Sequence, residues 1–207
     1  MIQIQKDFEI PASEEMLQKV ANRIRERNIE VLIVNNGEEA RQAVLERIPK
    51  GAQVHSGKSK TLQDSGIFDA MMDLNQYDAL RHQTFKMDRK TQMQEIRKLT
   101  AAPDFMLGSV NAITEDGILV AASATAGQIG PYANTAGKVI LVVGSQKIVP
   151  DLAAALRRIR EHVQPWEEAQ VWKAMNAKTF VGKILIIERE SVNERMTVIL
   201  VREPIGI

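Results

Sequence analysis

The stretch that decides the fold begins Glu30-Val31-Leu32-Ile33-Val34-Asn35-Asn36-Gly37 and ends Pro49-Lys50-Gly51-Ala52-Gln53-Val54. Residues 31–34 form a continuous apolar run that predicts a buried strand, and Asn-Asn-Gly ends it. Residues 38–48 follow with Ala40, Val44 and Ile48 on one helical face. Pro49-Lys50-Gly51 then turns the chain into a short strand over 52–54. A strand, a helix and a strand in this order predict a parallel sheet that the helix covers.

The same alternation continues on both sides of this stretch. Helices are predicted over 13–27, within 68–100 and from 150 onward. Strands are predicted near 104–112, 118–122 and 138–144, and a hairpin or strand pair that adds antiparallel edge strands is predicted over 183–201. The sequence therefore predicts one α/β domain over residues 1–207, with a mostly parallel sheet covered by helices and a C-terminal strand pair.

Charge and hydropathy limit the kinds of partner. The chain has 207 residues with 27 basic and 26 acidic side chains, and its net charge of +1 favours neither nucleic acid nor an anionic membrane. Residues 81–98 are locally basic but lack interleaved aromatic residues, which is typical of a solvated helical face. The first seven residues lack the apolar core of a signal peptide, and no apolar run approaches the ~20 residues of a membrane helix. A cytoplasmic location is expected.

The residue types that hold metals and redox groups are scarce. The chain has no cysteine, which excludes disulfides, thiolate metal sites and iron–sulfur ligation by this chain itself. Its three histidines are far apart and lack the spacing of zinc ligands: His55, His82 and His162. We therefore expect neither a metal nor a cofactor.

A small polar loop follows the strand at 52–54, and a helix is predicted to start near Thr61. Gly57-Lys58-Ser59 is similar to the end of a phosphate-binding loop, but Gly51 lies one residue too far away for that motif, which disfavours a nucleotide triphosphatase. A loop before a helix can still hold a phosphate or carboxylate. On that interpretation the ligand-binding residues are Ser56, Gly57, Lys58, Ser59 and Thr61. The alternative is an ordinary strand-to-helix turn with its lysines in solvent.

An acidic pair lies in Glu115-Asp116-Gly117, between two strand-like segments. An Asp-Gly pair is a common turn signal, so one interpretation is a hairpin over 113–120 with solvated carboxylates. In the other, Glu115 or Asp116 faces a cleft near residues 55–61 and acts as an acid, base or nucleophile. Taken alone, the spacing favours the hairpin.

The segment 124–132 is long, uncharged and rich in small residues. It lacks the glycine fingerprint of a dinucleotide-binding loop. Small residues let a ligand approach the backbone, and Pro131 suits the first turn of a helix. We expect contacts to a small ligand from Thr125, Gly127, Gln128 and Gly130. The alternative is tight packing of a short helix against the sheet.

Four segments together resemble the LUD domain family, the lactate utilisation proteins of the LutC type. Gly57-Lys58-Ser59-Lys60-Thr61-Leu62 looks like the family's Gly-x-Ser-x-Thr-Leu segment, and residues 111–117 look like its Asn/His-Ala-Ile/Val-Thr-x-Asp/Thr-Gly stretch. The loop at 123–132 is similar in placement, and residues 139–158 are the most specific piece. The chain departs from the pattern at Ile118, where Thr is usual, and at Gln128, where some members carry a nearby arginine.

This resemblance implies a fold similar to that of sugar-phosphate isomerases and CoA transferases. It implies an anion loop at 56–61 and acid/base candidates at Glu115 and Asp116. Proteins of the LutC type are implicated in the oxidation of L-lactate to pyruvate beside iron–sulfur partner subunits, and a subunit without cysteine agrees with such partners. The resemblance thus implies an accessory subunit that binds a small anionic metabolite.

Two alternative functions stay open. One is a stand-alone isomerase or acyl/CoA-transferase-like enzyme that uses Glu115 or Asp116, with a carboxylate activated by burial or by a neighbouring charge such as Lys58. The other is a non-enzymatic interaction module whose C-terminal strands pair with a partner, or with a second copy in a homo-oligomer. The sequence does not decide whether the protein is an enzyme.

Overall fold

A computed structural model describes residues 6–207. The segment 1–7 was predicted to lack a signal-peptide core, and its residues 1–5 lie outside the described range. The strands are β1 (Glu30–Val34), β2 (Gln53–Ser56), β3 (Asp78–Ala79), β4 (Phe105–Gly108), β5 (Ala112–Thr114), β6 (Leu119–Ser123), β7 (Lys138–Gly144), β8 (Ile148–Val149), β9 (Lys183–Ile187) and β10 (Met196–Val201). The α-helices are α1 (Glu14–Glu26), α2 (Gly37–Leu45), α3 (Lys60–Asp64), α4 (Ile67–Met71), α5 (Leu80–Phe85), α6 (Met93–Thr100), α7 (Leu152–Arg158) and α8 (Gln164–Met175). Short turns of other helix types are η1 (Lys6–Glu9), η2 (Pro131–Thr135), η3 (Ser145–Lys147) and η4 (Ile159–Val163).

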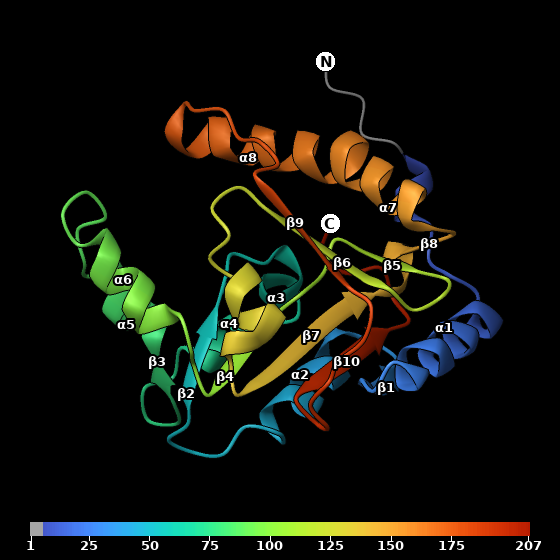
Figure 1. Cartoon of the computed structure of the whole chain (residues 1–207), viewed down its shortest axis with the longest axis horizontal. Helices are drawn as coiled ribbons and strands as arrows, with labels where there is room; N and C mark the ends of the chain where they lie inside the picture. The colour runs from blue at the N-terminus through green and yellow to red at the C-terminus, as the bar shows by residue number, and fades with distance from the viewer. Residues whose placement is uncertain (1–5) are drawn as a thin grey trace.

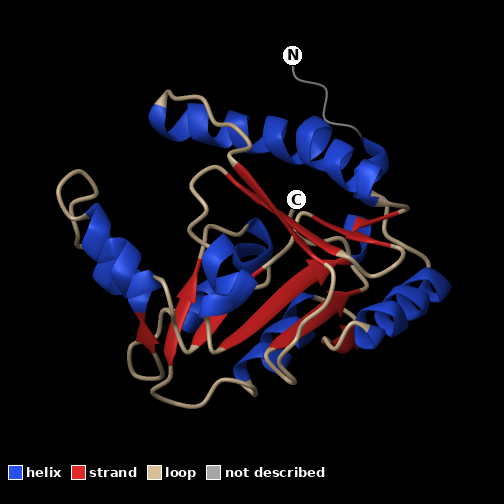
Figure 2. Cartoon of the chain, viewed as in Figure 1, coloured by secondary structure: helices blue, strands red, loops and turns tan. Residues whose placement is uncertain are grey.

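The main sheet has six strands in the order β1-β10-β7-β4-β2-β3, and every neighbouring pair in it is parallel. This confirms the predicted α/β fold with a mostly parallel sheet flanked by helices. A second sheet has the order β8-β5-β6-β9 and is largely antiparallel. Figure 2 shows the two groups of strands in red. The sequence did not predict this second sheet, because apolar runs do not reveal which strands pair.

The two C-terminal strands are present as predicted, but they do not form a hairpin with each other. β9 pairs with β6 at an antiparallel edge of the smaller sheet. β10 lies inside the main sheet, parallel to both β1 and β7. All six residues of β10 are buried, which an edge position would not provide.

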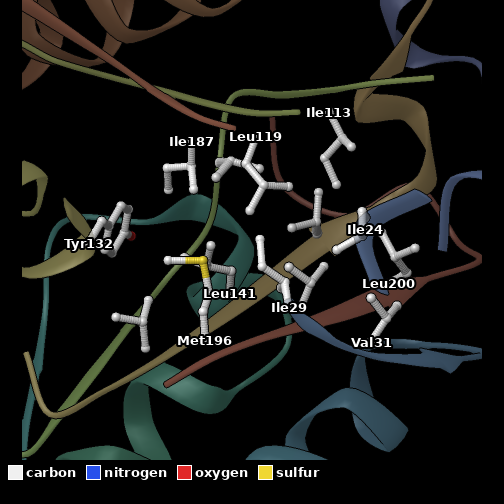
Figure 3. Close-up of a cluster of buried hydrophobic side chains, with 14 of the residues drawn as sticks. Ile24, Ile29, Val31, Ile113, Leu119, Tyr132, Leu141, Ile187, Met196 and Leu200 are labelled. Carbon is white, nitrogen blue, oxygen red and sulfur yellow. The ribbon is translucent and has the colours of Figure 1, made fainter. Parts of the chain in front are cut away.

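The core lies on both faces of the main sheet. Alternate residues of β7 point to opposite sides: Leu141 joins one buried cluster, whereas Val142 joins the other. Figure 3 shows the first cluster, where Ile24 of α1 and Leu119 of the smaller sheet meet Leu141. The second cluster packs α2, α3 and α4 against the opposite face. Because both faces are covered, the parallel strands are almost uninterrupted apolar runs.

Local signals set the helix starts. The hydroxyl of Ser13 accepts a hydrogen bond from the Met16 N–H at the start of α1, and Asp151 caps α7 in the same way. The Asn36 side chain caps α2, which ends at Leu45 rather than at residue 48. The predicted strand over 52–54 extends to Ser56, so Ser56 lies in β2 and not in the following loop. Within the described range, no helix is both long and apolar enough to cross a membrane.

Candidate functional site

The carboxyl ends of β2, β4 and β7 lie side by side at one edge of the main sheet, since these strands are parallel and in register. Crevices at this edge are where open α/β sheets bind ligands. The chain segments that leave the three strands begin with Gly57, Ser109 and Ser145. These segments therefore supply the side chains that a ligand would meet.

Lys147 lies at the centre of this edge. It is only 2% exposed, although it carries an ammonium or amine group. Its Nζ donates to Thr61 Oγ1 at 2.9 Å, to Ser109 Oγ at 3.1 Å and to the Val110 carbonyl at 3.4 Å. All three partners are neutral oxygens, so hydrogen bonds satisfy the buried nitrogen without balancing a positive charge.

A buried guanidinium, that of Arg158 of α7, contacts the same segment after β4 that Lys147 contacts. Its Nη1 donates to the Asn111 carbonyl at 2.6 Å, while Lys147 contacts Ser109 and Val110. Burial lowers the pKa of Arg158 to about 10. Burial, and then the charge of Arg158, hold the pKa of Lys147 well below its usual value, and Asp64 offsets this only in part.

Arg81 of α5 supplies a second guanidinium, which lies at the end of β2. Its Nη1 donates to the Ser56 carbonyl at 3.2 Å, and its guanidinium lies 4.8 Å from the ring centroid of Phe85. Arg81 is half-buried, whereas the other basic residues of the predicted solvated face over 81–98 are exposed: Lys86, Arg89, Lys90, Arg97 and Lys98. Burial, and then the charge of Arg81, lower the pKa of the adjacent His55 to about 4. His55 is therefore neutral near pH 7.

The three basic side chains all lack an acidic partner in the part of the chain that the structure describes. Within the described residues, no carboxylate forms an ion pair with Arg81, Lys147 or Arg158. In addition, the buried Nε of Arg81 and the buried Oγ of Ser56 have no hydrogen-bond partner in this part of the chain. Buried charges and polar groups in proteins are normally paired. The site therefore has positive charge and bonding capacity that an anion would satisfy.

The structure brings together the two loops that the sequence singled out. A Cβ atom added to Gly57 would lie 3.4 Å from Oε1 of Gln128, so the Gln128 side chain packs against the Gly57 backbone here. Both ends of the small-residue loop are also tied to the segment after β4. Asn111 Oδ1 accepts from the Ala122 N–H at 2.6 Å, and the Tyr132 hydroxyl donates to the Ser109 carbonyl at 3.4 Å.

The predicted residues of the 56–61 loop have different roles. Thr61 is buried and contacts both Ser109 and Lys147. Ser59 caps α3, because its hydroxyl accepts from the Leu62 N–H at 3.3 Å. Lys58 forms an ion pair with Glu167 of α8 at 2.8 Å. Among the predicted ligand-binding residues of this loop, Ser56 and Thr61 thus have buried hydroxyls.

The small-residue loop is an ordered turn. Ser123 Oγ accepts from the Ala126 N–H at 3.0 Å and donates to Gln128 Oε1 at 3.1 Å. Thr125, Gly127 and Gly130 are exposed. The side chain of Gln128 is half-buried and lies nearest to Gly57. Pro131 begins the helical turn η2, as its position predicts.

The acidic pair occupies the turn of the β5–β6 hairpin, in agreement with the Asp-Gly turn signal. Glu115 Oε2 accepts from Lys19 Nζ of α1 at 2.8 Å, and Asp116 is exposed. The Asp116 carbonyl accepts from Arg27 Nε at 2.8 Å. The Glu115 carboxylate and the Asp116 carbonyl therefore bind to α1 and to its C-cap residue Arg27, and the role of the pair as acid, base or nucleophile stays a prediction.

Sequence reasoning missed Ser109, Lys147 and Arg158. The available signal was the position of Lys147, three residues after the apolar run 139–144 ends and directly before Ile148-Val149, where a solvated lysine is unexpected. In the described part of the chain, no group of three or more His, Asp or Glu residues is arranged to hold a metal.

Comparisons with known proteins agree with the observed fold. The family model of the LUD domain matches residues 17–201. A crystal structure of a DUF162 family protein from Deinococcus radiodurans is similar, with a TM-score of 0.56 and 15% sequence identity over 92% of this chain and 99% of that chain. A search among curated proteins finds no match. At this identity, the likeness to the solved structure concerns the fold alone.

Proposed function

The chain belongs to the LUD domain family, and we propose that it binds a small anionic metabolite at the carboxyl edge of its main sheet, between residues 56–61 and 123–132. One observation carries the proposal. The guanidinium of Arg81 is half-buried and that of Arg158 is buried at this edge, and neither forms an ion pair with a carboxylate of the described residues. A bound carboxylate or phosphate supplies the missing negative charge.

The individual contacts support a small ligand. Ser56 and Arg81 have buried polar atoms without partners in the described chain, and both lie at the end of β2. The Gln128 side chain lies against Gly57, where it joins the two loops. In our proposal the guanidinium of Arg81 binds the anion, and Gln128 contacts its neutral part.

The metabolite of this proposal is a hydroxy acid such as L-lactate. The protein then acts as an accessory subunit in the oxidation of L-lactate to pyruvate, beside iron–sulfur oxidoreductase subunits. The absence of cysteine supports the assignment of the iron–sulfur clusters to other subunits, because such a chain cannot ligate an iron–sulfur cluster itself. The outer helix α8 (Figure 1) offers a surface for these partners, since Trp172, Met175 and the following Phe180 are exposed.

Isothermal titration calorimetry tests the binding proposal. The panel is L-lactate, pyruvate, a sugar phosphate and a CoA thioester. We expect at least one to bind, and Arg81→Gln to weaken that binding about tenfold or more, because a charge-assisted hydrogen bond contributes about 1.5–3 kcal/mol. Lys98→Gln, which neutralises an exposed cation on α6, is the matched control and should leave the affinity unchanged. Failure of all four anions to bind would refute the proposal.

The accessory role has a separate test. L-lactate-dependent reduction of a redox dye is measured with the iron–sulfur subunits alone and after addition of this protein. We expect the rate to rise on addition, and to rise less with the Trp172→Ala, Phe180→Ala double variant if α8 is the docking surface. An unchanged rate on addition of the wild-type protein would remove the accessory role while leaving the binding proposal standing.

A further inference from the structure

Ser109 and Lys147 form a close pair that anion binding alone does not require. Ser109 Oγ lies 3.1 Å from Lys147 Nζ, within the range of a hydrogen bond between a nucleophile and its base. Thr61 Oγ1 lies 2.9 Å from the same Nζ and 3.3 Å from Ser109 Oγ. Nucleophile, base and a third group that orients the base are therefore in mutual contact.

We propose that Ser109 is the nucleophile of an acyl-transfer reaction, that Lys147 is its general base, and that Thr61 is a positioning residue that orients the amine. The substrate is a small acyl ester or thioester. This inference deepens the proposed function, because it rests on the same edge of the sheet and on the same loops. The flanking guanidinium of Arg158 favours an acyl group that carries negative charge.

The hydrogen-bond pattern fits an uncharged amine. A neutral lysine has two N–H donors and one lone pair, and it has three oxygen neighbours here. The Val110 carbonyl only accepts, and Thr61 Oγ1 accepts the second N–H. The hydroxyl hydrogen of Ser109 can turn from the Val110 carbonyl, 3.3 Å away, to the lone pair of Lys147. Burial without an ion pair keeps the amine uncharged and able to accept that proton.

Accessibility selects Ser109 as the reacting group. Thr61 and Lys147 are buried, whereas Ser109 is half-buried. Gly206 covers Thr61 with φ of +74°, and a Cβ added there would come within 2.1 Å of Thr61 Oγ1. The segment that carries Ser109 adjoins the small-residue loop, since the Tyr132 hydroxyl at the end of that loop donates to the Ser109 carbonyl. A substrate between the loops therefore reaches Ser109 and not the other two residues.

The proposed reaction balances without an external oxidant or reductant. Ser109 Oγ forms a bond to the acyl carbon, the carbonyl π electrons move to oxygen, and Lys147 Nζ takes the hydroxyl proton. The bond from the acyl carbon to the leaving oxygen or sulfur then breaks, and Lys147 gives the proton to that leaving group. Water, or an alcohol or thiol acceptor, attacks the acyl–Ser109 ester in the same way and releases the serine.

Labelling by a fluorophosphonate probe, with intact mass and peptide mapping, tests this pair in the full chain. We expect labelling at Ser109 in the wild type, none at that position in Ser109→Ala, about a 100-fold lower rate in Lys147→Met, and an unchanged rate in the exposed-serine control Ser191→Ala. Absence of labelling at Ser109 in the wild type, or an equal rate in Lys147→Met, would overturn the inference.

A pH profile keeps the test decisive if Lys147→Met does not fold. The wild-type labelling rate at Ser109 should rise and level off at a pH well below 10.5, the usual pKa of lysine, as the amine loses its proton. A flat profile would overturn the inference. Calorimetry on Ser109→Ala distinguishes this inference from the proposed function. If this variant still binds the anion and the wild type is not labelled at Ser109, the acyl-transfer step is refuted and the binding proposal stands.

Discussion

The hydroxyl of Thr61 lies 2.9 Å from the Nζ atom of Lys147, although 86 positions separate the two residues in the sequence. This contact joins a loop that the sequence identified to a lysine that it did not. It exists because β2 and β7 are parallel strands on either side of β4, so that their carboxyl ends open onto one edge. The buried amine on that edge has consequences for stability as well as for ligand binding.

The unfolding free energy should rise with pH above neutrality because of Lys147. Its pKa is lowered in the folded state, whereas the unfolded lysine has a pKa near ~10.4. Between these two pKa values the unfolded chain binds more protons, so raising the pH favours the folded state by up to about 1.4 kcal/mol per pH unit. Urea unfolding at several pH values up to about 9.5 measures this slope. Lys147→Met should lack the slope and Lys98→Met should keep it; equal slopes in all three proteins would contradict the prediction.

His55 should make the protein sensitive to mild acid. Its pKa is about 4 in the folded protein and 6.5 ordinarily, so the unfolded chain binds the extra proton as the pH falls through that window. The unfolding free energy should fall by up to about 3 kcal/mol between these two pH values. Thermal unfolding of His55→Asn should show a smaller fall than wild type, whereas His82→Asn should retain it. A wild-type protein with a constant free energy over this window would refute the assignment.

Gly117 should not tolerate a side chain. Its φ is +83°, and a Cβ atom there would lie 2.8 Å from backbone atoms of both Arg23 and Ile24 in α1. We expect Gly117→Ala to reduce the unfolding free energy by about 2–4 kcal/mol, through backbone strain and forced separation of the hairpin from α1. Gly127→Ala is the control, because a Cβ atom at that exposed position meets nothing within 4 Å. Similar denaturation midpoints for both variants would contradict this packing.

Much of the fold could be predicted because burial leaves a pattern in the sequence. The apolar runs at β1, β7 and β10 are continuous because helices or the smaller sheet cover both faces of the main sheet. Helix starts were marked by capping residues such as Ser13 and Asp151. The pairing of β10 was not predictable, because an apolar run is equally compatible with a central strand and with a hairpin.

The candidate site was predictable only in part. Small residues in two loops identified Gly57 and Gln128, which do lie close together. Arg81 was assigned only to a solvated face, and Lys147 and Arg158 escaped notice, because basic residues are normally solvated and composition does not show which of them the fold buries. Their lack of carboxylate partners is a property of three-dimensional packing, and no spacing rule encodes it.

A crystal structure grown with the tightest-binding anion of the calorimetric panel tests the central claim most directly. The account predicts anion density between residues 56–61 and 123–132, with an anion oxygen within about 3 Å of the Arg81 guanidinium and contacts to Ser56 or Gln128. Density for the anion elsewhere, with the space between these two loops empty, would contradict the claim.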